Sequence, residues 1–132
     1  MSKKLLKGKK GIIFGALDEK SIAWKTAERI HEEGAEMVLT NAPVSIRMGQ
    51  IENLALKTNS LLVPADATSL TDLDNLIDKS VSYFGSKIDF VLHSIGMSIN
   101  VRKGKSYTDL NHEWMKKGWD VSAVSFHKLI QS

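Results

Sequence analysis

The feature that most constrains the fold of this chain is a regular alternation between short apolar runs and amphipathic stretches. Apolar runs of strand length occupy residues 10–14, 35–40, 60–65 and 87–94. Stretches with helical period lie between them, at residues 21–34, 44–58 and 69–85. Ser69 stands three residues before Asp72, close to a capping-box pattern, and Gly85 is a typical helix stop. The alternation predicts four strands joined by three helices.

Connections of this length determine how the strands run. A crossover between parallel strands needs a dozen or more residues, and a helix supplies them. We therefore expect an α/β fold, a Rossmann-like doubly wound parallel sheet with strand order 3-2-1-4, forming the first half of a longer domain. In such sheets ligands bind beyond the carboxyl ends of the strands, where the strand order reverses. The loop after Phe14 and the segment "HSIGMS" at 93–98 both fall at that position.

Charge and composition exclude several classes of protein. The chain has 132 residues, a net charge of +3 and 42% hydrophobic residues, which is ordinary for one globular domain. The lysines of "MSKKLLKGKK" have no aromatic residues among them, which favours a solvated chain end over a nucleic-acid interface. There is no cysteine, no signal peptide and no membrane span. We expect a cytoplasmic protein without nucleic-acid or membrane partners, and without a metal site, because the four histidines share no ligand spacing.

The stretch "GIIFGALDEKSIAW" at 11–24 predicts an anion site between a strand and a helix. The strand ends at Phe14, the chain turns at Gly15, and a helix begins near Ser21 with its free N–H groups pointing back at the turn. The second and third glycines of the common dinucleotide fingerprint are missing. A tight turn at Gly15 without any ligand is the alternative interpretation.

Two further predicted strands are followed by residues that could contact a nucleotide. Asp66 follows the third strand, where its carboxylate or the neighbouring amide could meet an adenine edge, and Gly96 follows the fourth, where the chain could pass close to a flat ring. Taken singly, Asp66 could be a helix cap and Gly96 a turn. The joint occurrence at three successive strand ends indicates a nucleotide site.

These motifs resemble one known family. "GKKGIIFGALDEKSIAW" with its Gly-x5-Ser-Ile-Ala loop, "HEEGAE", the aspartate at 66 and "DFVLHSIGM" are similar to the NADH-dependent enoyl-acyl carrier protein reductases of bacterial fatty-acid synthesis, a divergent branch of the short-chain dehydrogenases. The resemblance spans nearly all of this chain but only about the first half of a family member. It implies NADH as cofactor, an enoyl-acyl carrier protein as substrate, and a dimeric or tetrameric full-length protein.

The resemblance also implies roles for particular residues. The cofactor contacts are Gly15, Ser21 and Ile22 for the pyrophosphate, Asp66 and the backbone of Ala67 for the adenine, and Ile95 and Gly96 for the nicotinamide ribose. Met97 and Ser98 would border the acyl-substrate pocket. The choice of NADH over NADPH stays open, because Ala42 stands where an acidic residue often binds the ribose diol, and Arg47 nearby could meet a 2′-phosphate.

The catalytic pair of the family is a Tyr-x6-Lys motif, and this chain lacks it. No lysine stands seven residues after either tyrosine, Tyr83 or Tyr107. Tyr83 and Lys87 have the Tyr-x3-Lys spacing of the classical branch, but Gly85 should end the helix between them. We therefore expect no catalytic residue within this chain and the tyrosine and lysine beyond residue 132. Alternatives are another short-chain reductase, such as a 3-oxoacyl-carrier-protein reductase, or a non-catalytic nucleotide-binding module.

The last third of the chain leaves two features open. The basic loop "NVRKGK" at 100–105 could dock an acidic carrier protein or be an ordinary solvated loop. Trp119, Ala123, Phe126 and Ile130 form an apolar stripe, either an oligomer contact or ordinary core. An uncovered stripe beside an uncovered strand 4 is unusual for a soluble domain. We therefore expect residues 1–132 to be one truncated domain at the front of a longer protein.

Overall fold

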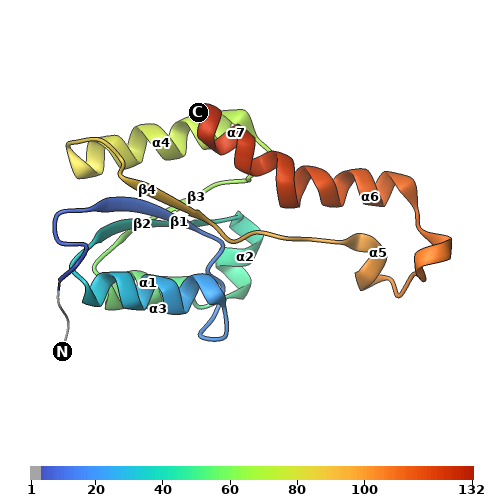
Figure 1. Cartoon of the computed structure of the whole chain (residues 1–132), viewed down its shortest axis with the longest axis horizontal. Coiled ribbons are helices and arrows are strands. Elements are labelled where there is room, and N and C mark those ends of the chain that lie inside the picture. Colours follow the sequence, from blue (N-terminus) through green and yellow to red (C-terminus); the bar gives the residue numbers. More distant parts are fainter. Residues whose placement is uncertain (1–3) are drawn as a thin grey trace.

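A computed structural model describes residues 4–132 of the chain and contains one four-stranded parallel sheet, in the order β3-β2-β1-β4 (Figure 1). The strands are β1 (Lys10–Phe14), β2 (Glu36–Asn41), β3 (Leu61–Pro64) and β4 (Phe90–His93). In the register of the sheet, Ile12 of the inner strand β1 pairs with Val38 on one side and Val91 on the other. The predicted fold class, strand order and strand direction are confirmed.

Helices cover both faces of this sheet. The α-helices of the described residues are α1 (Ile22–Glu32), α2 (Pro43–Met48), α3 (Ile51–Lys57), α4 (Leu70–Phe84), α5 (Ile99–Arg102), α6 (His112–Trp119) and α7 (Ser125–Gln131). Figure 1 shows α1 and α3 on one face and α4 and α7 on the other. Alternate residues of β1 point to opposite faces, so Ile12 and Phe14 join one buried cluster while Ile13 joins the other.

The single helix predicted at 44–58 is wrong, because the structure has two helices there, separated at Gly49 and Gln50. The loop after β1 lies against the break. The carbonyl of Leu17 accepts the N–H of Gln50 at 2.8 Å. A Cβ atom on Gly49 would lie 2.6 Å from the same carbonyl oxygen. The helix is interrupted by a tertiary contact that its own periodicity does not contain.

The start of α4 connects this helix to the loop that follows β3. Ser69 caps the helix, its hydroxyl accepting the N–H of Asp72 at 3.2 Å. The Asp72 carboxylate does not return to the cap, as in a capping box, but accepts the N–H of Asp66 at 2.9 Å. The cap therefore also holds the chain at Asp66 in place.

The last helices form one long helical segment that extends past the sheet. A π-helical turn at Asp120–Val124 joins α6 to α7, and Figure 1 shows α5 and α6 projecting beyond the carboxyl edge of the sheet. Leu129 and Ser125 are buried, whereas Trp119 is 68% exposed and Phe126 and Ile130 are also exposed. The apolar stripe therefore lies on the surface of residues 4–132. No helix of the described residues is long and apolar enough to cross a bilayer.

Candidate cofactor-binding site

The carboxyl edge of the sheet carries two adjoining pockets. One, of about 400 Å³, is lined by Gly15, Ile95 and Gly96 among others. The second, of about 200 Å³, is lined by Asp66, Ala67 and again Ile95. Both also share Asn41 and Met97 as walls, so we call them together the carboxyl-edge groove. The fold thus brings together five of the seven predicted cofactor contacts from three separate strand ends.

Gly15 turns the chain at the end of β1 with φ of +119°, a conformation that favours glycine. Its N–H donates to the carbonyl of Thr40 at 3.1 Å. A Cβ atom at this position would overlap the carbonyl oxygen of Ser94. The predicted turn is confirmed, and the missing side chain makes room for a neighbouring strand end of the chain itself.

Ser21 organises the loop between β1 and α1. Its Oγ accepts the N–H groups of Leu17 and Asp18, both at 3.0 Å, and makes no side-chain cap to the helix. Among residues 4–132 the hydroxyl proton of Ser21 has no acceptor. Ser21 therefore shapes the loop through its oxygen and keeps one donor for a ligand.

The first turn of α1 carries free N–H groups. The first hydrogen bond of the helix is from Lys25 N–H to the Ser21 carbonyl at 3.2 Å, and the N–H groups of Ile22, Ala23 and Trp24 have no acceptor in the described part of the chain. Ile22 is 79% exposed and, like Ser21, lines neither pocket of the groove. The two predicted pyrophosphate residues thus lie at an uncapped helix N-terminus, which attracts anions.

Some polar groups of Asp66 and Ala67 are hydrogen-bonded within the described fold, and others have no partner there. The Oδ1 atom of Asp66 accepts the N–H of Thr68 at 2.8 Å and its hydroxyl at 2.7 Å. These two bonds to Thr68 lower the pKa of the Asp66 carboxyl below its ordinary value. The Ala67 N–H has no acceptor within residues 4–132. This N–H and the second carboxylate oxygen of Asp66 thus make no hydrogen bond within the described residues.

The segment after β4 lies between the carboxyl-edge groove and a third pocket. A Cβ atom on Gly96 would have only the Oγ of Ser122 nearby, at 4.0 Å, so this backbone faces open space. Met97 lines both pockets of the groove and also a third pocket of about 460 Å³, where Ser98 joins it. The Ser98 hydroxyl accepts the N–H of Val101 at 3.3 Å and caps α5. The two predicted substrate-side residues thus border a pocket on the outer side of the groove.

Sequence reasoning missed several lining residues of the groove, among them Asn41, Lys117 and Arg102. Asn41 holds the end of β2 to the loop after β1, its Nδ2 donating to the Ala16 carbonyl at 2.8 Å. Lys117 lines the pocket that contains Asp66, and Arg102 lines the pocket that contains Gly15. Asn41 had a sequence signal, a polar residue at the end of a buried strand. Arg102 lies in α5 and Lys117 in α6, both of which project beyond the edge. The sequence indicated Arg102 only as part of a possible docking loop and contained no signal for Lys117.

Other predicted features lie away from the groove. The Tyr83 hydroxyl donates to the Asn59 carbonyl at 3.4 Å, and Gly85, with φ of +65°, separates Tyr83 from Lys87. Neither side chain lines the groove. Arg47 also lies outside its lining. In the described residues no group of three or more side chains could hold a metal ion.

His93, at the end of β4, is hydrogen-bonded to the helical segment that follows α6. Its Nε2 atom lies 2.7 Å from the hydroxyl oxygen of Ser125. The ring of Phe126 packs against its edge, with centroids 5.4 Å apart. Burial lowers the pKa of this histidine below its ordinary value, which favours the neutral ring.

Several known proteins similar to this chain carry the same kind of name. The family described as enoyl-(acyl carrier protein) reductase matches residues 15–132. Enoyl-[acyl-carrier-protein] reductase [NADH] 2 of Rhizobium meliloti is 30% identical over 126 residues, which cover 95% of this chain and 46% of the relative. The corresponding NADH reductase of Mycolicibacterium smegmatis is 32% identical over 133 residues, covering 97% of this chain and 48% of the relative.

Solved structures share the fold. The FabI-NADH complex from Alistipes finegoldii superimposes with a TM-score of 0.95 and 66% identity, over 97% of this chain and 45% of that protein. The enoyl reductase of Anaplasma phagocytophilum in complex with NAD gives a TM-score of 0.87 at 26% identity, over 99% of this chain and 50% of that protein. This chain spans about half the length of these relatives. With the family match covering residues 15–132 and the same Rossmann-like fold, the chain belongs to the enoyl-(acyl carrier protein) reductase family.

Proposed function

We propose that this chain is the cofactor-binding portion of an NADH-dependent enoyl-acyl carrier protein reductase of fatty-acid elongation. One observation carries the proposal: Gly15, the pair Asp66–Ala67 and the pair Ile95–Gly96 come from three strand ends and line one groove. Relatives whose names specify NADH support this cofactor over NADPH.

The free donors of the site suit the parts of NADH in order. The pyrophosphate would take the free N–H group of the exposed Ile22 and the hydroxyl proton of Ser21. The adenine edge would take the N–H of Ala67 and the carboxylate of Asp66. The nicotinamide end would lie along the open side of Gly96.

When bound, NADH would supply the hydride that adds to the β-carbon of the enoyl thioester. The tyrosine and lysine that stabilise the resulting enolate would lie beyond residue 132, in the rest of a single domain of which residues 1–132 are the first part. Neither Tyr83 nor Lys87 lines the groove, which supports this placement. The chain would then seat the cofactor, without the groups that complete the reaction.

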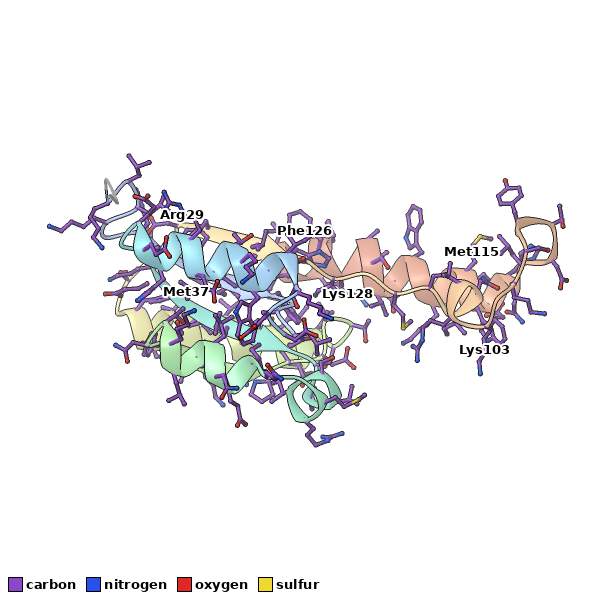
Figure 2. The ribbon with its side chains drawn as sticks, turned by 90° about the horizontal axis from the view of Figure 1, so that it is seen from below. Arg29, Met37, Lys103, Met115, Phe126 and Lys128 are labelled. Atoms are coloured by element: carbon purple, nitrogen blue, oxygen red, sulfur yellow. The ribbon has the colours of Figure 1, made fainter. Side chains whose placement is uncertain are left out.

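The surface of the projecting helices suits an acidic carrier protein as substrate. Figure 2 shows Lys103 on α5's side of this projection, distant from Arg29 on the sheet body. Arg102 and Lys103 are exposed and make no ion pair with the described residues, whereas Lys105 pairs with Asp109 at 3.4 Å. Arg102, which lines the groove, and the adjacent Lys103 are two unpaired cations that would attract a negatively charged partner.

The exposed apolar stripe supports a homo-oligomer. Trp119, Phe126 and Ile130 lie along one line of the helical segment and are exposed in this chain. A second copy of the full-length protein would cover such a stripe, as apolar patches of this kind mark association surfaces.

The decisive experiment compares the 132-residue chain with the full-length protein. NADH oxidation is followed with crotonyl thioester, with a 3-oxoacyl thioester, and without substrate, and NADH binding is measured by fluorescence titration. We expect the full-length protein to bind NADH and reduce the enoyl thioester, and the 132-residue chain to show no turnover. Turnover by the short chain would place the catalytic groups within it. Preference for the 3-oxoacyl thioester would favour the other short-chain reductase, and NADH binding without any turnover would favour the non-catalytic module.

A further inference from the structure

The helical segment that borders the carboxyl-edge groove contains an irregular turn with two serines. The π-helical turn at Asp120–Val124 interrupts the segment between α6 and α7. Such turns insert one extra residue into a helix and are frequent at functional sites. Ser122 lies in this turn and Ser125 directly follows it. The Ser125 hydroxyl bonds to His93, the last residue of β4, and the Ser122 hydroxyl bonds to Met97 in the segment that follows.

Ser125 holds His93 at the end of β4, where this segment begins. Its hydroxyl is buried and donates its proton to the Val121 carbonyl at 2.7 Å. A hydroxyl has a single proton, so the contact with Nε2 of His93, also 2.7 Å, has the imidazole as donor. The end of β4 is thereby fixed to the helix.

Ser122 holds the chain four residues further on. The N–H of Met97 donates to Ser122 Oγ at 2.9 Å, and the Ser122 hydroxyl donates to the Met97 carbonyl at 3.2 Å. One side chain thus satisfies both backbone groups of Met97. Gly118 permits the close approach, because a Cβ atom there would stand 3.0 Å from the same Met97 carbonyl oxygen. Figure 1 shows the chain after β4 running beside α6 toward α5.

Met97, the residue that Ser122 holds, lies between the carboxyl-edge groove and the outer pocket. Met97 lines both pockets of the carboxyl-edge groove and the outer pocket, and the open side of Gly96 precedes it directly. A shift of the Met97 backbone would therefore change the wall between the cofactor side and the substrate side. Adenine and pyrophosphate contacts lie on other strand ends and would not move with it.

We propose that Ser122 is a positioning residue for enoyl reduction. It holds Met97 so that the bound enoyl group and the nicotinamide are aligned for hydride transfer. This inference rests on the proposed function. Ser122 acts through the backbone of Met97 and takes no proton from the substrate. Its loss should therefore affect turnover of the thioester more than affinity for NADH.

The test uses the full-length protein with Ser122→Ala, Ser122→Thr and a control, Ser82→Ala, whose side chain lies exposed on α4 without a hydrogen bond. We expect Ser122→Ala to lower kcat/KM for crotonyl thioester about tenfold, the effect of losing two modest hydrogen bonds, with the NADH Kd changed less than about threefold. Ser122→Thr, which keeps the hydroxyl, should recover most of the activity. Hydrogen exchange of the Met97 amide should accelerate in Ser122→Ala while the remaining core amides stay protected.

Each outcome decides the inference. Unchanged kcat/KM and unchanged Met97 exchange in Ser122→Ala would overturn it and leave the proposed function standing. If NADH affinity, Tm and turnover all fall together in Ser122→Ala, Ser122 has a structural role only. If Ser122→Ala does not fold, Gly118→Ala replaces it, because its Cβ atom displaces the same carbonyl, and the same two readouts apply. A wild-type protein that reduces no enoyl thioester would refute the proposed function, and this inference with it.

Discussion

Gly15 lies so close to Ser94 that any Cβ atom at position 15 would overlap the Ser94 carbonyl oxygen. The two residues end neighbouring strands, and the Ser94 N–H donates to the Phe14 carbonyl at 2.9 Å. This contact stands where the strand order reverses, so the turn after β1 and the chain after β4 form adjacent walls of one groove.

We expect Gly15→Ala to lose both stability and NADH binding. Strain at φ of +119° and the overlap with Ser94 should lower the free energy of unfolding by about 2 kcal/mol or more. Urea unfolding and NADH titration measure the two effects. Gly85→Ala is the control, since Gly85 also has positive φ but open space around it. It should lose about 1 kcal/mol and keep NADH binding. A Gly15→Ala protein with wild-type stability and affinity would contradict this account.

Ser21→Ala should weaken NADH binding about tenfold, because the N–H groups of Leu17 and Asp18 lose their acceptor and the loop before α1 loses its shape. The free energy of unfolding should fall by only about 1 kcal/mol, since the loop is exposed. Isothermal titration with NADH checks the affinity, and Ser82→Ala serves as the reference for a serine without contacts. Equal affinities of Ser21→Ala and this reference would refute the role of the hydroxyl.

Asp66→Asn should change the pH dependence of stability. Hydrogen bonds from Thr68 lower the Asp66 pKa in the folded state, so the ionised carboxylate stabilises the fold above its unfolded pKa. That contribution is lost as the pH falls through the lowered folded pKa. The asparagine variant should therefore be less stable at neutral pH, by about 1 kcal/mol or less because the carboxylate is exposed, and should converge with wild type in acid. Denaturant unfolding across this range measures it. A pH-independent difference would contradict the assignment.

Lys103→Glu should raise KM for an acyl-carrier-bound enoyl substrate severalfold, while KM for a short CoA thioester stays the same. The charge at position 103 is exposed and outside the groove lining, so the cofactor site is left intact. Lys79→Glu, an equal charge change on exposed α4, is the matched control. Equal effects on both substrates, or an equal effect of the control, would argue against docking at this loop.

Trp119→Asp with Phe126→Asp should shift the full-length protein to a smaller assembly. Two carboxylates on the exposed stripe would have to be buried in any contact that covers it. Sedimentation velocity measures the assembly. A mass unchanged from that of wild type would show that the stripe does not form the contact between copies.

Several parts of the fold were predictable because their causes are local. The alternating periods predicted four parallel strands in the order found, and Ser69 and Gly85 marked the ends of α4 correctly. Helix crossovers force parallel strands whatever the surroundings. The positions of Gly15, Asp66 and Gly96 at strand ends followed directly, since carboxyl ends of parallel strands meet at one edge.

Only the tertiary structure decided how those strand ends are held. The carbonyl of Leu17 interrupts the helix at Gly49, and Ser122, 25 residues away, holds the backbone of Met97 by hydrogen bonds. Neither contact leaves a periodic signal, because each depends on hydrogen bonds between segments distant in the sequence. The sequence alone thus determined the sheet and the edge at which a ligand would bind. Long-range packing decided which backbone donors stay free there and which face of the last helix is exposed.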